Sequence, residues 1–198
     1  MAQLQADDTF VDVGAFFGLY AIAAAQRVGR AGRVFAFEPV PSSFDILKKH
    51  IALNAVQDVV EAHCCAVGEH DGDANFACEH SCQSHILPDG TDSFKVPIRS
   101  LDSVLKNRRA DMIKIDVEGL EEMVLRGAAT LLNDRARRPR AIFIEVHPYN
   151  WHLCNTTSES LLRYLRMYDY EVKTLEGTLV SYIDGYGEII ATARNSKQ

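Results

Sequence analysis

The 198-residue sequence has no apolar run approaching the ~20 residues that a membrane-spanning helix requires. Its first eight residues carry neither the basic segment nor the apolar core of a secretion signal, so we expect a cytoplasmic protein without a membrane partner. Positive charge is also scarce, because 21 lysines and arginines face 27 acidic residues and leave a net charge of −6. This balance argues against a nucleic-acid partner, which needs a basic face for the phosphates.

Cysteine is present, but its pattern fits neither a disulfide framework nor a metal site. The five cysteines are an odd number, and Cys64 and Cys65 are adjacent, so we expect reduced thiols. Residues 78–85 bring two cysteines and two histidines close together, and both residue types bind zinc. The paired C-x-x-C spacing is missing and no second pair follows, so we expect no metal there.

Short apolar runs alternate with amphipathic helical patterns along most of the chain. We expect strands at residues 9–13, 33–38, 59–67, 112–116 and 141–146, and helices at 19–26, 42–53, 101–106, 121–132 and 158–168. Two more strands, at 170–175 and 188–193, have no helix between them and should form an antiparallel hairpin at the sheet edge. The fold class is therefore α/β, a Rossmann-like fold with a mostly parallel seven-stranded sheet and helices on both faces.

Three local features qualify this pattern. Residues 68–98 are polar and rich in turns, and we interpret them as an irregular hairpin excursion from a single domain spanning residues 1–198, with short strands near 75–77 and 94–98. Ser42 to Asp45 has the spacing of a capping box at the start of the second helix. Residues 135–140 contain four arginines, which we expect in a solvated loop.

Acidic residues stand at the carboxyl ends of four expected strands. They are Asp12, Glu38, Asp116 and Glu145. Sheets of this kind bind ligands beyond those ends, at the point where the strand order reverses. Any one of these carboxylates could cap a helix or pair with a cation, but four at one edge indicate a functional site.

The loop after the first strand lacks the glycine pattern of a diphosphate site. Gly14 and Gly18 are present, but Phe16 stands where the G-x-G-x-x-G pattern needs its second glycine, and no Gly-Lys-Ser/Thr sequence follows. A bulky ring there disfavours a pyrophosphate and hence a dehydrogenase. A glycine turn without a diphosphate suits S-adenosyl-L-methionine, and Glu38, about 20 residues further on, suits its ribose hydroxyls.

With these features in place, the sequence resembles the FkbM family of methyltransferases. The matching segments are residues 12–15, 18–20, 34–39, 53–54, 66–68, 101–103, 114–121 and 144–147. The resemblance covers about residues 9–148, and Lys114-Ile115-Asp116-Val117-Glu118-Gly119-Leu120-Glu121 is its most specific part. The sequence departs from the family at Phe16, where asparagine is usual, and in the short stretch before the first strand.

The resemblance implies a methyltransferase that uses S-adenosyl-L-methionine. It implies a cofactor site made by Asp12, Gly14, Ala15 and Gly18 around the methionine part, Glu38 at the ribose, Cys65 and Ala66 beside the adenine, and Asp116 near the reactive methyl group. Pro39 is a further cofactor-binding candidate. The acceptor that it implies is a hydroxyl on a sugar, glycan or polyketide-like small molecule.

A hydroxyl acceptor requires a group that takes its proton. The catalytic candidates are Asp116, Glu118, Glu145 and His147. His147 has a reference pKa near neutrality, although a surface or helix-capping histidine is an equal alternative, and Glu118 and Glu121 could instead cap the helix beside them. Two other functions stay open: a divalent-metal-assisted methyltransferase with Asp116 and Glu145 as ligands, and a binding module that has lost catalysis.

Overall fold

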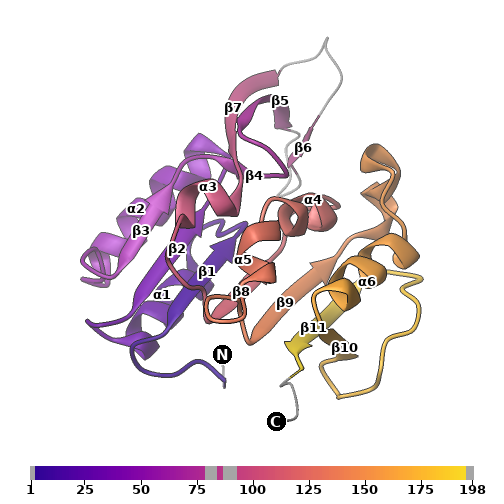
Figure 1. Cartoon of the computed structure of the whole chain (residues 1–198). Coiled ribbons are helices and arrows are strands. Elements are labelled where there is room, and N and C mark those ends of the chain that lie inside the picture. Colours follow the sequence, from indigo (N-terminus) through magenta and orange to yellow (C-terminus); the bar gives the residue numbers. More distant parts are fainter. Residues whose placement is uncertain (1–2, 79–83, 87–92, 195–198) are drawn as a thin grey trace.

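The computed structural model describes residues 3–78, 84–86 and 93–194, and at its centre lies a seven-stranded sheet with the order β10-β11-β9-β8-β1-β2-β3 (Figure 1). The strands are β1 (Thr9–Val13), β2 (Arg33–Phe37), β3 (Val60–His63), β8 (Met112–Ile115), β9 (Ala141–Val146), β10 (Tyr170–Thr174) and β11 (Gly187–Ala193). The first five of these are parallel, whereas β11 is antiparallel to both β9 and β10. The predicted sheet and its antiparallel edge hairpin are confirmed.

Helices cover both faces of this sheet, because successive strand residues point to opposite sides. The helices are α1 (Leu19–Val28), α2 (Pro41–Leu53), α3 (Leu101–Leu105), α4 (Glu121–Arg126), α5 (Ala129–Asn133) and α6 (Ser158–Met167). α1 and α2 pack with Phe10 of β1, whereas α3 to α6 pack with its neighbour Val11. The helices do not cover the edge at which the parallel strands end, and the loops that follow the strands lie there. Among the described residues, no helix is both long and apolar enough to cross a bilayer.

The predicted excursion is a second, four-stranded sheet with the order β4-β7-β5-β6. Its strands are β4 (Ala66–Val67), β5 (Gly72–Cys78), β6 (Ser84–Ile86) and β7 (Ser93–Arg99), and it stands above the carboxyl edge of the main sheet (Figure 1). The expected short strands at 75–77 and 94–98 lie within β5 and β7. The single strand expected at 59–67 is wrong, because the chain leaves the main sheet after His63 and enters the small sheet at Ala66. His80 and Cys82 of the zinc hypothesis lie outside the described residues.

Two helix predictions are also corrected. The helix expected at 121–132 breaks into α4 and α5 at Gly127, where an added Cβ would lie 2.0 Å from the carbonyl oxygen of Gly68. This close approach of two backbones requires glycine and ties α4 to the start of the small sheet. The capping box at Ser42 is absent, because α2 begins at Pro41, whose missing N–H needs no acceptor.

The arginine-rich loop is more than a solvated connection. Arg140 forms ion pairs with buried Asp8 and, at 3.5 Å, with Asp111. Asp8 Oδ2 also accepts the backbone N–H of Gln5 at 2.6 Å. Burial by itself raises the pKa of Asp8, but the guanidinium of Arg140 and the N–H of Gln5 outweigh it and hold that pKa below its usual value. These contacts fasten the segment before β1 to the start of β9.

Asp8→Asn removes this ion pair, and we expect it to lower the free energy of unfolding near neutral pH by about 1–3 kcal/mol, below the cost for a fully buried pair because Arg140 is partly exposed. The folded-state pKa of Asp8 lies below the unfolded value of about 3.9, so the contribution is complete above that pH and fades as the pH falls towards the folded-state pKa. Urea unfolding at a series of pH values measures the difference. Asp7→Asn, at an exposed position, is the control, and a difference for Asp8→Asn that persists unchanged in acid would contradict the assignment.

Candidate active site

In the turn between β1 and α1, the backbone N–H groups are already hydrogen-bonded within the protein. The N–H groups of Gly14 and Ala15 both donate to the carbonyl oxygen of Phe37, at 3.1 and 2.8 Å. The N–H of Phe16 donates to Oε2 of Glu38 at 2.8 Å. Donors of this kind bind the phosphates of dinucleotides, and here they are already occupied within the protein. The occupied backbone donors are therefore a second reason against a dinucleotide, besides the bulk of the Phe16 ring.

Glu38 connects this turn to the start of α2. Its carboxylate lies at the end of β2, is almost fully buried, and accepts the N–H of Phe16 and, at 2.9 Å, the N–H of Val40. Burial raises the pKa of Glu38 above its ordinary value, and the two hydrogen bonds and Lys114 offset that effect only in part. Phe16 contributes only its backbone N–H to this contact, so the turn keeps its shape without the asparagine that is usual in the resembled family.

A cavity opens beyond the carboxyl ends of β1, β2 and β8. It is lined by Val13, Gly14, Phe16, Phe37, Glu38, Pro39, Val40, Ser42, Ser43, Cys65, Ala66, Val67, Asp116, Val117, Glu118 and Leu120. Six of the predicted cofactor residues line this cavity: Gly14, Glu38, Pro39, Cys65, Ala66 and Asp116. The other three, Asp12, Ala15 and Gly18, are absent from its lining. Gly14 must be glycine, because an added Cβ would lie 1.8 Å from the carbonyl oxygen of Asp116.

Lys114 is a central residue that the sequence prediction missed. Its ammonium donates to the carbonyl oxygen of Gly14 at 2.7 Å and lies 3.4 Å from Asp12 and 3.3 Å from Asp116. Burial lowers the pKa of Lys114, but the two carboxylates outweigh it and raise that pKa above its usual value. A signal was available, because residues two apart on a strand share a face and Lys114 precedes Asp116 by two.

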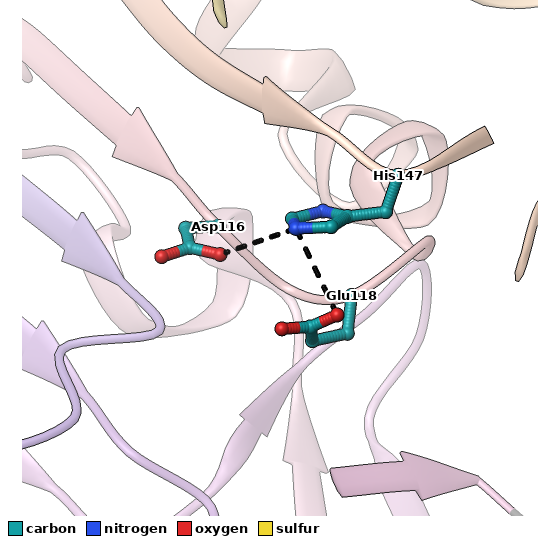
Figure 2. Close-up of side chains that lie close together, drawn as sticks. All are labelled: Asp116, Glu118 and His147. Carbon is teal, nitrogen blue, oxygen red and sulfur yellow. Dashed lines mark ion pairs between the residues drawn. The ribbon is translucent and has the colours of Figure 1, made fainter. Parts of the chain in front are cut away.

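His147, directly after β9, brings the predicted catalytic residues together. Its Nε2 lies 3.7 Å from Glu118 Oε2, 3.7 Å from Glu145 Oε1 and 4.0 Å from Asp116 Oδ1, and Figure 2 shows the ring nitrogen facing Asp116 and Glu118. The side chain of His147 is buried, so the alternative of a surface histidine is wrong. Burial lowers the pKa of His147, but the hydrogen bond to Glu121 and the surrounding carboxylates outweigh it and place the pKa above its ordinary value.

Glu121 orients His147 from the side away from the other carboxylates. It is fully buried and accepts three hydrogen bonds, from the N–H of Gly119 at 2.9 Å, from Nδ1 of His147 at 3.0 Å and from Nε1 of Trp151 at 2.8 Å. Trp151 comes from the 3-10 helix η1 (Pro148–Cys154) that follows β9. The predicted helix-capping role describes only the contact to Gly119. The position of Trp151 depends on η1, which the sequence did not place.

Two exposed tyrosines contact the same carboxylates. The hydroxyl of Tyr149 donates to Glu118 Oε2 at 2.7 Å, and the hydroxyl of Tyr186 donates to Glu145 Oε1. Both rings also lie against the imidazole of His147, with centroid separations of 5.7 and 5.4 Å. Tyr186 belongs to the connection between β10 and β11, where no sequence pattern distinguishes it. These rings give the acidic cluster an aromatic border that is open to solvent.

Comparison with known proteins adds sequence relatives. The methyltransferase FkbM domain matches residues 12–172 of this chain. Methyltransferase 1 of Beauveria bassiana is 28% identical over 148 residues, which cover 61% of this chain and 59% of that protein. Methyltransferase sdnD of Sordaria araneosa is 25% identical over 163 residues, which cover 64% of this chain and 62% of that protein. The chain thus spans about three-fifths of the length of these two relatives.

Solved structures show the same fold. A methyltransferase FkbM from Methylobacillus flagellatus superposes with a TM-score of 0.60 at 19% identity, covering 94% of this chain and 44% of that one. Fibrillarin from Aeropyrum pernix, in complex with natively bound S-adenosyl-L-methionine, gives a TM-score of 0.52 at 12% identity, covering 96% of this chain and 68% of that one. The architecture is that of the class I methyltransferases.

Glu121→Ala leaves three buried donors without an acceptor, and we expect it to lower the free energy of unfolding by about 2–4 kcal/mol. Glu159→Ala removes an exposed carboxylate of α6 and should change stability little. Chemical denaturation of both variants measures the contrast. Equal stability of Glu121→Ala and the unmodified chain would show that the carboxylate does not hold this corner of the fold.

Proposed function

Since this chain belongs to the FkbM family of methyltransferases, we propose that it transfers a methyl group from S-adenosyl-L-methionine to a hydroxyl of a sugar, glycan or polyketide-like small molecule. One observation carries the proposal. Asp116 and Glu118 line the cavity and also face Nε2 of His147. A methyl donor in the cavity and an acceptor at the acidic cluster would therefore meet at these two side chains.

The cavity has the chemistry that this cofactor requires. Each oxygen of the Glu38 carboxylate accepts one backbone N–H and keeps a further lone pair for a ribose hydroxyl. Cys65 and Ala66 form a buried wall suited to adenine, and burial raises the pKa of the Cys65 thiol to about 11, so the thiol is neutral. When bound, the cofactor supplies a methyl group that its positively charged sulfur has already activated. Asp116, which also lines the cavity, provides a negative charge there.

The acidic cluster suits a hydroxyl acceptor. Glu121 keeps a proton on Nδ1 of His147, so that Nε2 and the carboxylates of Glu118 and Glu145 are the groups able to take a proton there. The exposed rings of Tyr149 and Tyr186 provide flat surfaces of the kind that sugar and polyketide rings pack against. The net charge of −6 and the acidic site work against a phosphorylated or nucleic-acid acceptor. Convergence of these three groups, each able to take a proton, favours an enzyme over a binding module that has lost catalysis.

Calorimetric titration with S-adenosylhomocysteine and with NAD⁺ tests the cofactor. We expect S-adenosylhomocysteine to bind and NAD⁺ not to bind, because the donors of the β1–α1 turn are occupied. Transfer of a labelled methyl group to hydroxyl-bearing glycans and polyketides then tests the acceptor class. Binding of the dinucleotide alone would overturn the proposal, and transfer only to nitrogen or carbon acceptors would overturn its hydroxyl part.

Glu38→Ala should raise the dissociation constant of S-adenosylhomocysteine about 10- to 100-fold, the scale of losing hydrogen bonds to a charged group. Glu38→Gln, which keeps one side-chain oxygen, should have a smaller effect. Asp45→Ala in α2 removes an exposed carboxylate outside the cavity lining and is the matched control. Unchanged affinity in Glu38→Ala, with the control also unchanged, would place the ribose elsewhere.

A further inference from the structure

Three potential ligand atoms converge beside the proposed acceptor site and leave a gap between them. Asp116, Glu118 and His147 each offer one atom, and the three atoms lie within 4.8 Å of one another (Figure 2). Nε2 of His147 is 4.0 Å from the Asp116 oxygen and 3.7 Å from the Glu118 oxygen. These separations exceed the hydrogen-bond limit of about 3.2 Å. They suit ligands of one ion, because a point equidistant from the three atoms lies about 2.0–2.5 Å from each, in the range of metal–ligand bonds.

When the imidazole of His147 is neutral, all three residues can direct a lone pair towards the gap. Glu121 can only accept from His147, so the proton of the neutral imidazole is on Nδ1 and Nε2 carries a lone pair. The His147 side chain is only 3% exposed, and none of the hydrogen bonds described for it involves Nε2. Glu145 adds a third carboxylate oxygen at 3.7 Å from Nε2. An ion with two positive charges would offset this concentration of negative charge.

Each of the three side chains also contacts a residue outside the three-atom group, and for Glu118 this contact is made by Oε2, the same oxygen that faces His147. The contacting pairs are Glu121 with His147 at 3.0 Å, Tyr149 with Glu118 at 2.7 Å and Lys114 with Asp116 at 3.3 Å. Lys114 contacts Oδ2 of Asp116, whereas it is Oδ1 that faces His147. Outer contacts of this kind orient ligands in protein metal sites.

We propose that Asp116, Glu118 and His147 bind a divalent transition-metal ion. A mixed set of imidazole and carboxylate suits ions such as Mn²⁺ and Zn²⁺, and three protein ligands leave positions open for an acceptor hydroxyl. The sequence alternative paired Asp116 with Glu145 as ligands. In the structure Glu145 lies outside the three-atom group, and Glu118 and His147 complete the set instead.

The role of the ion rests on the proposed function. A hydroxyl bound to the ion becomes more acidic, and its proton passes to the carboxylate of Glu145. The oxygen then forms a bond to the methyl carbon with its electron pair. The bond from that carbon to sulfur breaks, its electrons stay on sulfur, and the sulfonium leaves as the neutral thioether S-adenosylhomocysteine. Tyr186, which donates to Glu145, would hold that base in place.

Titration of the whole chain with Mn²⁺, without cofactor, tests the site, because the electron paramagnetic resonance signal of free Mn²⁺ falls when the ion is bound. We expect one Mn²⁺ per chain. His147→Gln should weaken binding by at least about tenfold, since it removes a ligand rather than an outer contact. His152→Gln changes an exposed histidine of η1 and should leave binding unaltered.

Glu118→Gln is a second variant, which keeps an oxygen to accept from Tyr149 and should weaken Mn²⁺ binding to a similar degree. A chain that leaves the free Mn²⁺ signal unchanged, or both variants binding Mn²⁺ as tightly as the unmodified chain, would overturn the site. Calorimetry with S-adenosylhomocysteine separates this outcome from failure of the proposed function. A chain that binds S-adenosylhomocysteine but not Mn²⁺ loses only the ion site, whereas one that binds Mn²⁺ but not S-adenosylhomocysteine loses only the proposed function.

Discussion

The buried ammonium of Lys114 holds the two halves of the site together. It touches the backbone of the first turn through Gly14 and lies between the carboxylates of Asp12 and Asp116. At such short range in a poorly solvated place, the attraction between opposite charges is strong, and removing one partner would leave a buried charge uncompensated. The position of Asp116, which serves both the cavity and the acidic cluster, follows from this arrangement of charges. The cavity wall and the cluster are therefore parts of one electrostatic unit.

The site divides at β8. On the side of β1 and β2, the residues that line the cavity are largely apolar, with Glu38 as the buried carboxylate. On the side of β9, polar side chains dominate, and His147 is fixed by Glu121. This division suits a reaction in which one ligand is recognised by shape and hydroxyl groups and the other is activated by charge. Asp116 lies at the boundary and contributes to both the cavity and the acidic cluster.

The fold was largely predictable, because alternation of apolar runs with helical patterns fixes the layers of an α/β sheet. The strand-end rule likewise located the carboxylates of Asp12, Glu38, Asp116 and Glu145 at one edge. What escaped prediction depends on contacts between distant segments. The break at Gly127 arises from its approach to Gly68, and one uninterrupted pattern over 59–67 conceals a change of sheet.

The same reason explains the residues missed in the site. Tyr186 lies in the connection between β10 and β11, whose path has no periodic signal, and it reaches a carboxylate that is 41 residues away in the sequence. Glu121 was assigned to its own helix because the nearest partners in sequence were the visible ones. Lys114 was read as part of a strand, and only its burial between two carboxylates reveals its importance.

The small sheet has a further consequence. Ala66 and Val67 form β4 of that sheet and at the same time line the cavity of the main one. A molecule that occupies the cavity contacts both sheets, so its binding free energy adds to the free energy that keeps the small sheet folded against the large one. Occupancy of the cavity and local unfolding of the small sheet are thus thermodynamically linked. Local unfolding of the small sheet therefore reports whether the cavity holds a ligand.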